Sequence, residues 1–430
     1  MKNLYIYKII LVASLILAST SCKKEYKDPN AALATDVLNS SRGLTGIAVG
    51  LQKLYSAGRT GVYFNSVEAN GFVTNELLLR NSGNIPELQL FTGGNSVDGT
   101  NTTLGNLWSV SNKIIFDADN VITNAANLPD KDYAAGLIAY TSVFKALAIG
   151  NLSQYWEKIP AGIGANIGYI TRVEGFNKAI AVIDNALAVI AASQPSASFI
   201  ASVPKNINVK NTLLALKARY ALFAGNISLA LTTATLVDPV GYSTFDFDSQ
   251  TFNPIYDIAT STNNVFQPTD VKLGLSGAFI PDTDDKRVAF YTQPIPKAPF
   301  LGIKGFAAAL DSPIPVFLPG EITLIKAEAY ARQPDLTNAL IELNKVVTKT
   351  PASDHFGVGA ALPPLTGTYT QAQLLDLIYK HRCIELYMSG LKIEDMRRFG
   401  RPNSERKRNF FPYPFTERDN NPNTPADPTF

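Results

Sequence analysis

The side chains that usually carry acid–base, nucleophilic or metal chemistry are sparse in this 430-residue chain. There are two histidines, His355 in a region expected to be a loop and His381 in a region expected to be helical. Such a pair supports neither a two-histidine metal site nor a Ser-His-Asp triad. Cys383 stands among apolar neighbours in the same expected helix, which is typical of a small core residue. We therefore expect no catalytic residue, no metal site and no cofactor, and a protein that is not an enzyme.

A different chemistry, the recognition of uncharged polymers, is better represented. It needs rigid aromatic rings that stack on the apolar faces of sugars, and a few amide, carboxylate or guanidinium groups that fix the hydroxyls. Tyr155 and Trp156 form the most suggestive aromatic pair, at the end of an expected helix. The alternative interpretation is that Trp156 closes the end of that helix. We take Tyr155 and Trp156 as candidate ligand-binding residues.

The balance of charges argues against a nucleic-acid partner. Lys and Arg number 38 and Asp and Glu number 36, and two lysines, Lys2 and Lys8, lie in a segment that we expect to be removed. The mature chain then carries 36 charges of each sign. Proteins that bind nucleic acid normally have a clear basic excess, because contacts to phosphate supply most of their affinity. We expect no nucleic-acid partner.

The N-terminus has the pattern of an export signal. A basic start is followed by an apolar run at 9–18, by the small residues 19–21 and then by Cys22. The apolar run is too short to span a bilayer, which takes about twenty residues. Small residues directly before a cysteine resemble a lipobox. The alternative interpretation is an ordinary signal peptide followed by a cysteine that occurs there by chance. The sequence predicts a lipoprotein signal peptide at 1–21, lipidation at Cys22 and a polar tether at 22–40.

Cysteine usage agrees with a lipid anchor. Cys22 and Cys383 are the two cysteines of the chain, so acylation of Cys22 leaves no partner for a disulfide within one chain. Several acyl chains on one cysteine hold a protein firmly on a membrane, whereas a single chain is marginal.

Helical periodicity dominates the body of the chain, with apolar residues recurring on one face of each stretch. Neighbouring stretches are separated by short turns, as at Gly225 and Asn226 or at Pro334. These pairs look like tetratricopeptide-type helical hairpins, although the chain shows no clear 34-residue period. The expected helices are 135–154, 174–192, 211–223, 228–236, 321–332, 336–349 and 371–388, and the expected irregular segments are about 60–100, 156–170, 237–318 and 351–370.

The longest irregular segment, 237–318, is expected to fold onto the helices. Loops of this length in a compact domain are usually functional or disordered. The segment is too rich in Phe and Tyr for disorder, so we expect short strands or hairpins within it. The sequence predicts one mainly α-helical domain over 41–430, with an irregular ligand-binding insert at about 237–318.

Three stretches near the C-terminus carry a family resemblance. Residues 319–332 (PGEITLIKAEAYAR) match a helix with Glu at its start and Ala-Glu-Ala one heptad later. Residues 382–400 (RCIELYMSGLKIEDMRRFG) resemble the pattern Arg-x-x-Glu-Leu followed by Glu-Gly-x-Arg-x-x-Asp-x-x-Arg-x-Gly. Residues 412–417 (PYPFTE), with Asn-Pro at 421–422, are similar to a closing Pro-x-Pro-x-x-Glu…Asn-Pro. Together these motifs resemble the SusD/RagB family of nutrient-binding outer-membrane lipoproteins.

The chain departs from the family pattern at three positions. Ser389 stands where the family usually has Glu, Lys392 where it has Arg, and Leu318 where Arg is common. The charged residues of these motifs are interpreted as scaffold, because Glu328 and Arg332 have the i,i+4 spacing of a helix ion pair. We expect these charges to hold the last helix to earlier ones.

The resemblance implies a SusD-like helical fold and a glycan-binding protein on the outer membrane, lipid-anchored and facing the cell exterior. It also implies a partner, a SusC-like TonB-dependent outer-membrane transporter, to which oligosaccharides are delivered. In this family the loop equivalent to 70–80 often lies near the ligand, which adds Asn75, Glu76 and Arg80 to the candidate binding residues. The alternatives are a peptide-binding RagB-like variant, a helical-repeat surface scaffold without nutrient binding, and a surface hydrolase.

Overall fold

The computed structural model describes residues 37–430 except 262–264 and 297–299. The predicted signal peptide, Cys22 and most of the predicted tether lie outside the described residues. Residues Leu38–Phe430 form one compact unit. Its main core is continuous from α3 (Ser41–Ser56) to the C-terminal tail.

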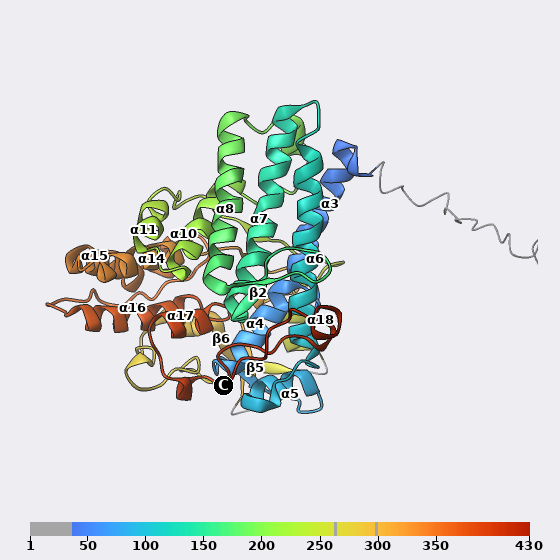
Figure 1. The fold of residues 1–430 in the computed structure, drawn as a ribbon. Helices are drawn as coiled ribbons and strands as arrows, with labels where there is room; N and C mark the ends of the chain where they lie inside the picture. Colours follow the sequence, from blue (N-terminus) through green and yellow to red (C-terminus); the bar gives the residue numbers. More distant parts are fainter. Residues whose placement is uncertain (1–36, 262–264, 297–299) are drawn as a thin grey trace, which may run out of the picture. The chain divides into compact units, whose positions relative to one another are not determined.

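A layer of long helices forms the first half of this unit (Figure 1). The central helix is α7 (Lys131–Tyr155), which is buried almost all round and packs between α6 (Thr102–Ala125) and α8 (Arg172–Ala192). A small residue allows the close approach of α8: a Cβ added at Gly175 of α8 would overlap Ser153 Oγ of α7. The layer is completed by α3 (Ser41–Ser56) and α10 (Val209–Phe223).

Helical hairpins make up the second half. The first joins α10 to α11 (Ile227–Ala234) through Gly225, whose φ of +82° suits a residue without a side chain. The second joins α14 (Pro319–Arg332) to α15 (Leu336–Val347), and α16 (Gln371–Glu385) packs on both. The helices α17 (Lys392–Arg398) and α18 (Phe415–Asn420) follow. The prediction of a mainly α-helical fold built from tetratricopeptide-like hairpins is confirmed.

The segment 60–100 was expected to be irregular, and this expectation is wrong. It contains α4 (Val62–Val73), β1 (Leu77–Leu79) and α5 (Ile85–Thr92). Nearly every residue of α4 is buried, including Asn65, Glu68 and Asn70. A helix that is surrounded on all sides has no one-sided apolar stripe, so the periodicity that reveals surface helices is missing.

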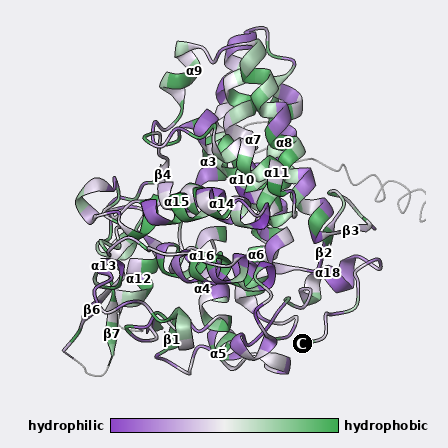
Figure 2. Cartoon of the chain, turned by 90° about the vertical axis from the view of Figure 1, so that its left-hand side faces the viewer, coloured by the Kyte–Doolittle hydropathy of each residue, from purple (hydrophilic) through white to green (hydrophobic). Residues whose placement is uncertain are grey.

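The segment 237–318 folds onto the helices as short elements, as expected. Antiparallel pairs form between β6 (Thr292–Pro294) and β7 (Leu301–Ile303), and between β4 (Thr244–Phe245) and β8 (Ile314–Pro315). Figure 2 shows β6, β7, α12 and α13 together on one side of the helices. The remaining short elements are β2 (Lys158–Pro160) paired with β3 (Tyr169–Thr171), β5 (Phe266–Pro268) paired with β1, the helices α9 (Ala197–Ser202), α12 (Pro254–Thr260) and α13 (Lys286–Tyr291), and single 3₁₀ turns at Gly94–Ser96, Gly277–Phe279, Gly305–Ala307, Pro351–Ser353 and Asn403–Glu405.

Ion pairs from the C-terminal motifs join α14, α16 and α17. Arg398 Nε and Arg332 Nε lie 2.7 and 2.8 Å from Glu328 Oε1, and Arg382 Nη2 lies 3.0 Å from Asp395 Oδ1. Burial alone would raise the pKa of Glu328, but Arg398 and then Arg382 and Arg332 lower it to about 2. The prediction that these charges hold the last helices to earlier ones is confirmed.

By length and composition alone, α7 and α8 are the two described helices that could cross a membrane. Core helices pass the same test, and 89% of the most apolar window of α7 is buried inside the protein. Length and composition are therefore weak evidence for a membrane span.

Candidate functional site

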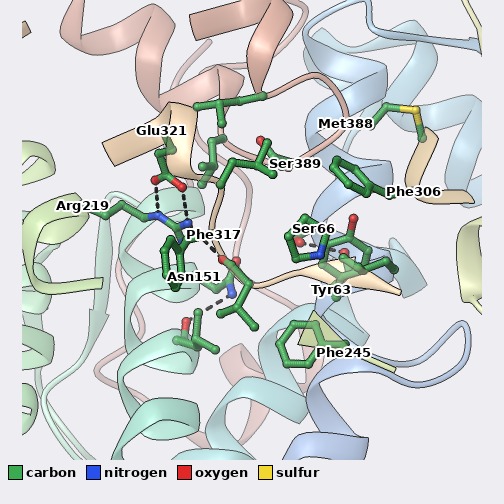
Figure 3. Close-up of a pocket in the computed structure, with 18 of the residues that line it drawn as sticks. Tyr63, Ser66, Asn151, Arg219, Phe245, Phe306, Phe317, Glu321, Met388 and Ser389 are labelled. Atoms are coloured by element: carbon green, nitrogen blue, oxygen red, sulfur yellow. Dashed lines mark hydrogen bonds and ion pairs between the residues drawn. The ribbon is translucent and has the colours of Figure 1, made fainter. Parts of the chain in front are cut away.

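A cavity of about 70 Å³ lies where the loop 386–391 meets α3, α4, α7, α10 and β8 (Figure 3). Its wall combines aromatic rings with amide, hydroxyl and charged groups, the mixture that recognition of polar ligands requires. Its lining includes Tyr63, Ser66, Asn151, Gln154, Arg219, Phe306, Leu318, Glu321, Met388, Ser389 and Gly390.

The cavity is small. One ordered water needs about 10–15 Å³, so about 70 Å³ accommodates a few waters. Pockets that hold organic ligands usually measure about 300–1,000 Å³. In this conformation the cavity is too small to contain a sugar ring.

The loop 386–391 is held in an unusual backbone conformation. Met388 has a φ of +58° and Gly390 a φ of +80°, and positive φ is rare for a residue with a side chain. The carbonyl of Gly390 accepts hydrogen bonds from Tyr155 OH at 2.6 Å and from the Gln154 side chain. These bonds from α7 fix the loop and stabilise the left-handed turn that forms one wall of the cavity.

A buried ion pair forms another wall. Arg219 of α10 donates from Nε to Glu321 Oε1 at 2.6 Å and from Nη2 to Glu321 Oε2 at 2.7 Å. Burial would lower the pKa of Arg219, but the Glu321 carboxylate raises it overall, so the guanidinium stays charged. Arg219 also donates to the Val316 carbonyl at 3.2 Å, which holds the chain after β8 against α10. Since both partners are engaged, the pair is structural.

Two of the departures from the family pattern meet at this cavity. Ser389 and Leu318 both line it, and Ser389 Oγ is buried without a hydrogen-bond partner among the described residues. Both positions carry long charged side chains in the family pattern. In this chain the shorter Ser389 and the apolar Leu318 occupy these positions and border the empty volume of the cavity.

A row of aromatic side chains leads from the surface to the cavity. The ring of Tyr242 stacks on His355 with 3.6 Å between centroids and packs edge-on against Phe356 at 5.8 Å. Phe356 in turn lies 5.9 Å from Phe306, which lines the cavity. We call Tyr242, His355, Phe356 and Phe306 the aromatic strip. Tyr242 is 45% exposed and His355 is exposed, so the outer end of the strip is open to ligands.

One polar side chain fixes each of the two turns that carry Tyr242 and His355. Asn211 of α10 accepts from the Asp238 amide at 2.7 Å and donates to the carbonyls of Asp238 and Gly241, which sets the turn that precedes Tyr242. Asp354 Oδ1 accepts from the amides of Phe356 and Val358 at 2.9 and 3.1 Å. Both rings are therefore presented by rigid turns, which lowers the entropic cost of binding.

Tyr155 and Trp156 are fully buried, and neither presents a face to a ligand in this structure. Trp156 Nε1 donates to the Pro412 carbonyl at 3.0 Å, and its ring packs on Trp108 at 4.9 Å. The alternative interpretation, that Trp156 closes the end of α7 against the C-terminal tail, describes this geometry. Tyr155 supports the cavity wall from behind, because its hydroxyl donates hydrogen bonds to the carbonyls of Ser66 and Gly390.

The loop between α4 and β1 also places its candidate residues in structural roles. Asn75 adopts a φ of +65° and donates to the Glu405 carbonyl at 3.3 Å. Glu76 is buried and accepts from Asn70 at 2.7 Å, and burial raises the pKa of Glu76 to about 7. The guanidinium of Arg80 lies 3.5 Å from the centre of the Phe300 ring. The structure does not bring these residues together with the outer end of the strip.

The sequence does not reveal the stack of Tyr242 on His355. His355 lies in an expected loop, and Tyr242 is one of many aromatic residues of the segment 237–318. No sequence pattern links two turns so far apart in the chain. The local signal that existed was the aromatic density of 237–318.

No group of three or more His, Cys, Asp or Glu side chains that could hold a metal ion occurs in the part of the chain that the structure describes. His381 is buried beside Arg287, and burial followed by Arg287 lowers its pKa well below the usual range. Cys383 is buried, and burial raises the pKa of its thiol to about 12. Both side chains are therefore neutral and enclosed near pH 7.

No protein-family model and no curated protein sequence matches the chain. Solved structures match along nearly its whole length. A SusD superfamily protein from Bacteroides thetaiotaomicron superposes with a TM-score of 0.67 at 16% identity, covering 92% of this chain and 100% of the other. A SusD/RagB family protein from the same organism gives 0.65 at 16% identity, with 89% and 95% covered. A SusD-like carbohydrate-binding protein from Bacteroides fragilis gives 0.63 at 14% identity, with 85% and 87% covered. The chain therefore has the SusD-like fold.

Proposed function

We propose that this protein is a cell-surface lipoprotein that binds glycans and delivers them to a SusC-like TonB-dependent outer-membrane transporter. The SusD-like fold supports this proposal, since one structure of that fold is described as a carbohydrate-binding protein. The three C-terminal motifs resemble the same family independently of the fold.

The observation that carries the glycan proposal is the exposed stack of Tyr242 on His355. Sugar rings have apolar faces that pack on aromatic rings, and rigid rings cost little conformational entropy to immobilise. The exposed ring of Tyr242 is available to receive such a ring. We also propose that the protein is not an enzyme and delivers the glycan without cleaving it. The neutral and enclosed side chains of His381 and Cys383 support this proposal.

Binding is tested by screening the purified protein on a glycan array and titrating each hit by calorimetry. A saturable heat with at least one oligosaccharide, and no change in the length of that oligosaccharide on long incubation, is expected. Shortening of the glycan would indicate a hydrolase. Saturable binding to peptides but to no glycan would favour the RagB-like alternative, and absence of any small ligand would favour the surface scaffold.

Anchoring and partnership are tested in the producing cell. Metabolic labelling with a fatty acid should mark the wild-type chain and fail to mark Cys22→Ser, because that variant lacks the thiol that receives the lipid. Affinity capture of the wild-type protein from detergent-solubilised outer membranes should recover a TonB-dependent barrel. Recovery of the chain without any barrel protein would contradict the proposed delivery.

A further inference from the structure

A second hollow, the α8–α10 groove, lies between α7, α8, α9 and α10 and measures about 680 Å³. It shares no lining residue with the cavity beside Ser389. Its volume is within the range of about 300–1,000 Å³ that is typical of ligand pockets. Apolar side chains dominate the lining, among them Leu187, Ile190, Phe199, Ile200, Val203 and Leu214.

The groove exists because α9 is fixed at a distance from α8 and α10. Phe199 of α9 rests directly on Gly136 of α7, where an added Cβ would overlap the ring. Tyr133 packs edge-on against Phe199 at 5.5 Å and bonds to Ser202 Oγ at 3.0 Å. Figure 2 shows apolar residues on α9 and on the nearby ends of α7 and α8. The neighbouring Ile200 remains 52% exposed, so this apolar wall is left open.

The charged side chains of the groove are of one sign. Lys205 and Lys210 line it, both are exposed, and its lining contains no acidic residue. Neither lysine forms an ion pair within the described part of the chain. Lys205 also borders a smaller polar pocket that includes Asp246 and Asp248. A substitution of Lys210 therefore tests the effect of positive charge in the groove without disturbing that pocket.

We propose that the α8–α10 groove binds a single-chain amphiphile with a carboxylate head, such as a long-chain fatty acid. The hydrocarbon chain would cover the apolar wall that includes Ile190, Ile200 and Leu214, and the carboxylate would face Lys205 and Lys210. Apolar surface drives the burial of the chain, and the unpaired ammonium groups select an anionic head over a neutral one. This site is separate from glycan binding, and the proposal stands whether or not the proposed function is correct.

The test is a calorimetric titration of the purified protein with ten-, twelve- and fourteen-carbon carboxylates, each below its micelle-forming concentration. Affinity should rise about fourfold for each added CH₂, which is the factor expected for burial of one methylene. The alcohol of the same chain length should bind more weakly. Absence of saturable binding, or equal affinity for acid and alcohol, would overturn the proposal.

Variants locate the site. Lys210→Gln should weaken carboxylate binding about twofold to fivefold, as expected for an exposed ion pair, and leave the alcohol unchanged. Ala191→Phe, which places a ring in the groove from α8, should weaken binding of both. The matched control Lys272→Gln removes an exposed lysine that does not line the groove and should change nothing. Thermal melting of each variant checks folding.

A membrane surface that contains anionic lipid could also present acyl chains with negatively charged heads. Co-sedimentation with vesicles that contain an anionic lipid separates the two. If the protein binds such vesicles but not the monomeric acid, or if Lys272→Gln weakens acid binding as much as Lys210→Gln does, the assignment to the groove is wrong.

Discussion

The phenol ring of Tyr242 lies almost parallel to the imidazole of His355, with 3.6 Å between centroids and 22° between the planes. The two residues come from turns that are far apart in the sequence. Asn211 fixes one turn and Asp354 fixes the other. This stack is the exposed outer end of the aromatic strip, and two fixed turns hold it in place.

The buried ion pair between Arg219 and Glu321 should be essential for stability. Glu321→Gln leaves a buried guanidinium without its charged partner, and such losses cost about 3–5 kcal/mol. The free energy of unfolding in urea measures this effect. The double variant Arg219→Met/Glu321→Met removes both charges and should be more stable than Glu321→Gln. A single variant as stable as wild type would show that the pair contributes nothing.

Gly320, the second residue of the first C-terminal motif, should not tolerate a side chain. A Cβ there would overlap the carboxylate of Glu385, which is buried and bonded to Arg287 at 3.1 Å. Gly320→Ala should destabilise the protein by about 1–3 kcal/mol, as overpacking usually does. Gly105 of α6 is the control, because an added Cβ there meets nothing within 4 Å. Gly105→Ala should be neutral or stabilising, since alanine favours the helix, and equal denaturant midpoints for the two variants would contradict this account.

The contribution of Glu68 to stability should decline as pH rises from about 5 to about 8. Burial, followed by the nearby Glu87 carboxylate, raises the pKa of Glu68 to about 8. In this range the native state keeps a proton on Glu68 that the unfolded chain releases, so the native state binds more protons and loses stability with increasing pH. Burial raises the pKa of Glu76 to about 7, which acts in the same direction.

Urea unfolding at several pH values measures this decline. Glu68→Gln resembles the protonated side chain and should reduce the loss of stability by at least about 1 kcal/mol, because one pKa unit corresponds to about 1.4 kcal/mol. The exposed Glu157→Gln is the control and should keep the wild-type slope. Identical slopes for wild type and Glu68→Gln would show that Glu68 is ionised in the native protein.

Local sequence patterns predicted most of the helical scaffold. The helix expected at 174–192 is Arg172–Ala192, and the helix expected at 336–349 is Leu336–Val347, because both have one apolar face. The last long helix ends at Glu385, three residues earlier than expected, because the following turn is left-handed at Met388. The helix α4 was missed because it is buried on all sides.

The candidate site could not be predicted in the same way. Trp156 had the residue type and the position of a sugar-binding ring, yet its contacts with Trp108 and the Pro412 carbonyl bury it. The pairing of Tyr242 with His355 depends on tertiary contacts between distant turns. No local periodicity encodes such contacts, so the sequence indicated only that the segment 237–318 is rich in aromatic residues.

The most direct test is a comparison of glycan affinity between Tyr242→Ala and Phe116→Ala. Both variants remove an exposed aromatic ring, and Phe116, which lies on α6, is 50% exposed. For an oligosaccharide identified on the array, calorimetry should show about twofold to twelvefold weaker binding to Tyr242→Ala, the equivalent of about 0.5–1.5 kcal/mol for one ring stack. Phe116→Ala should bind like wild type. Unchanged affinity of Tyr242→Ala, or an equal loss in both variants, would contradict a glycan site at the aromatic strip.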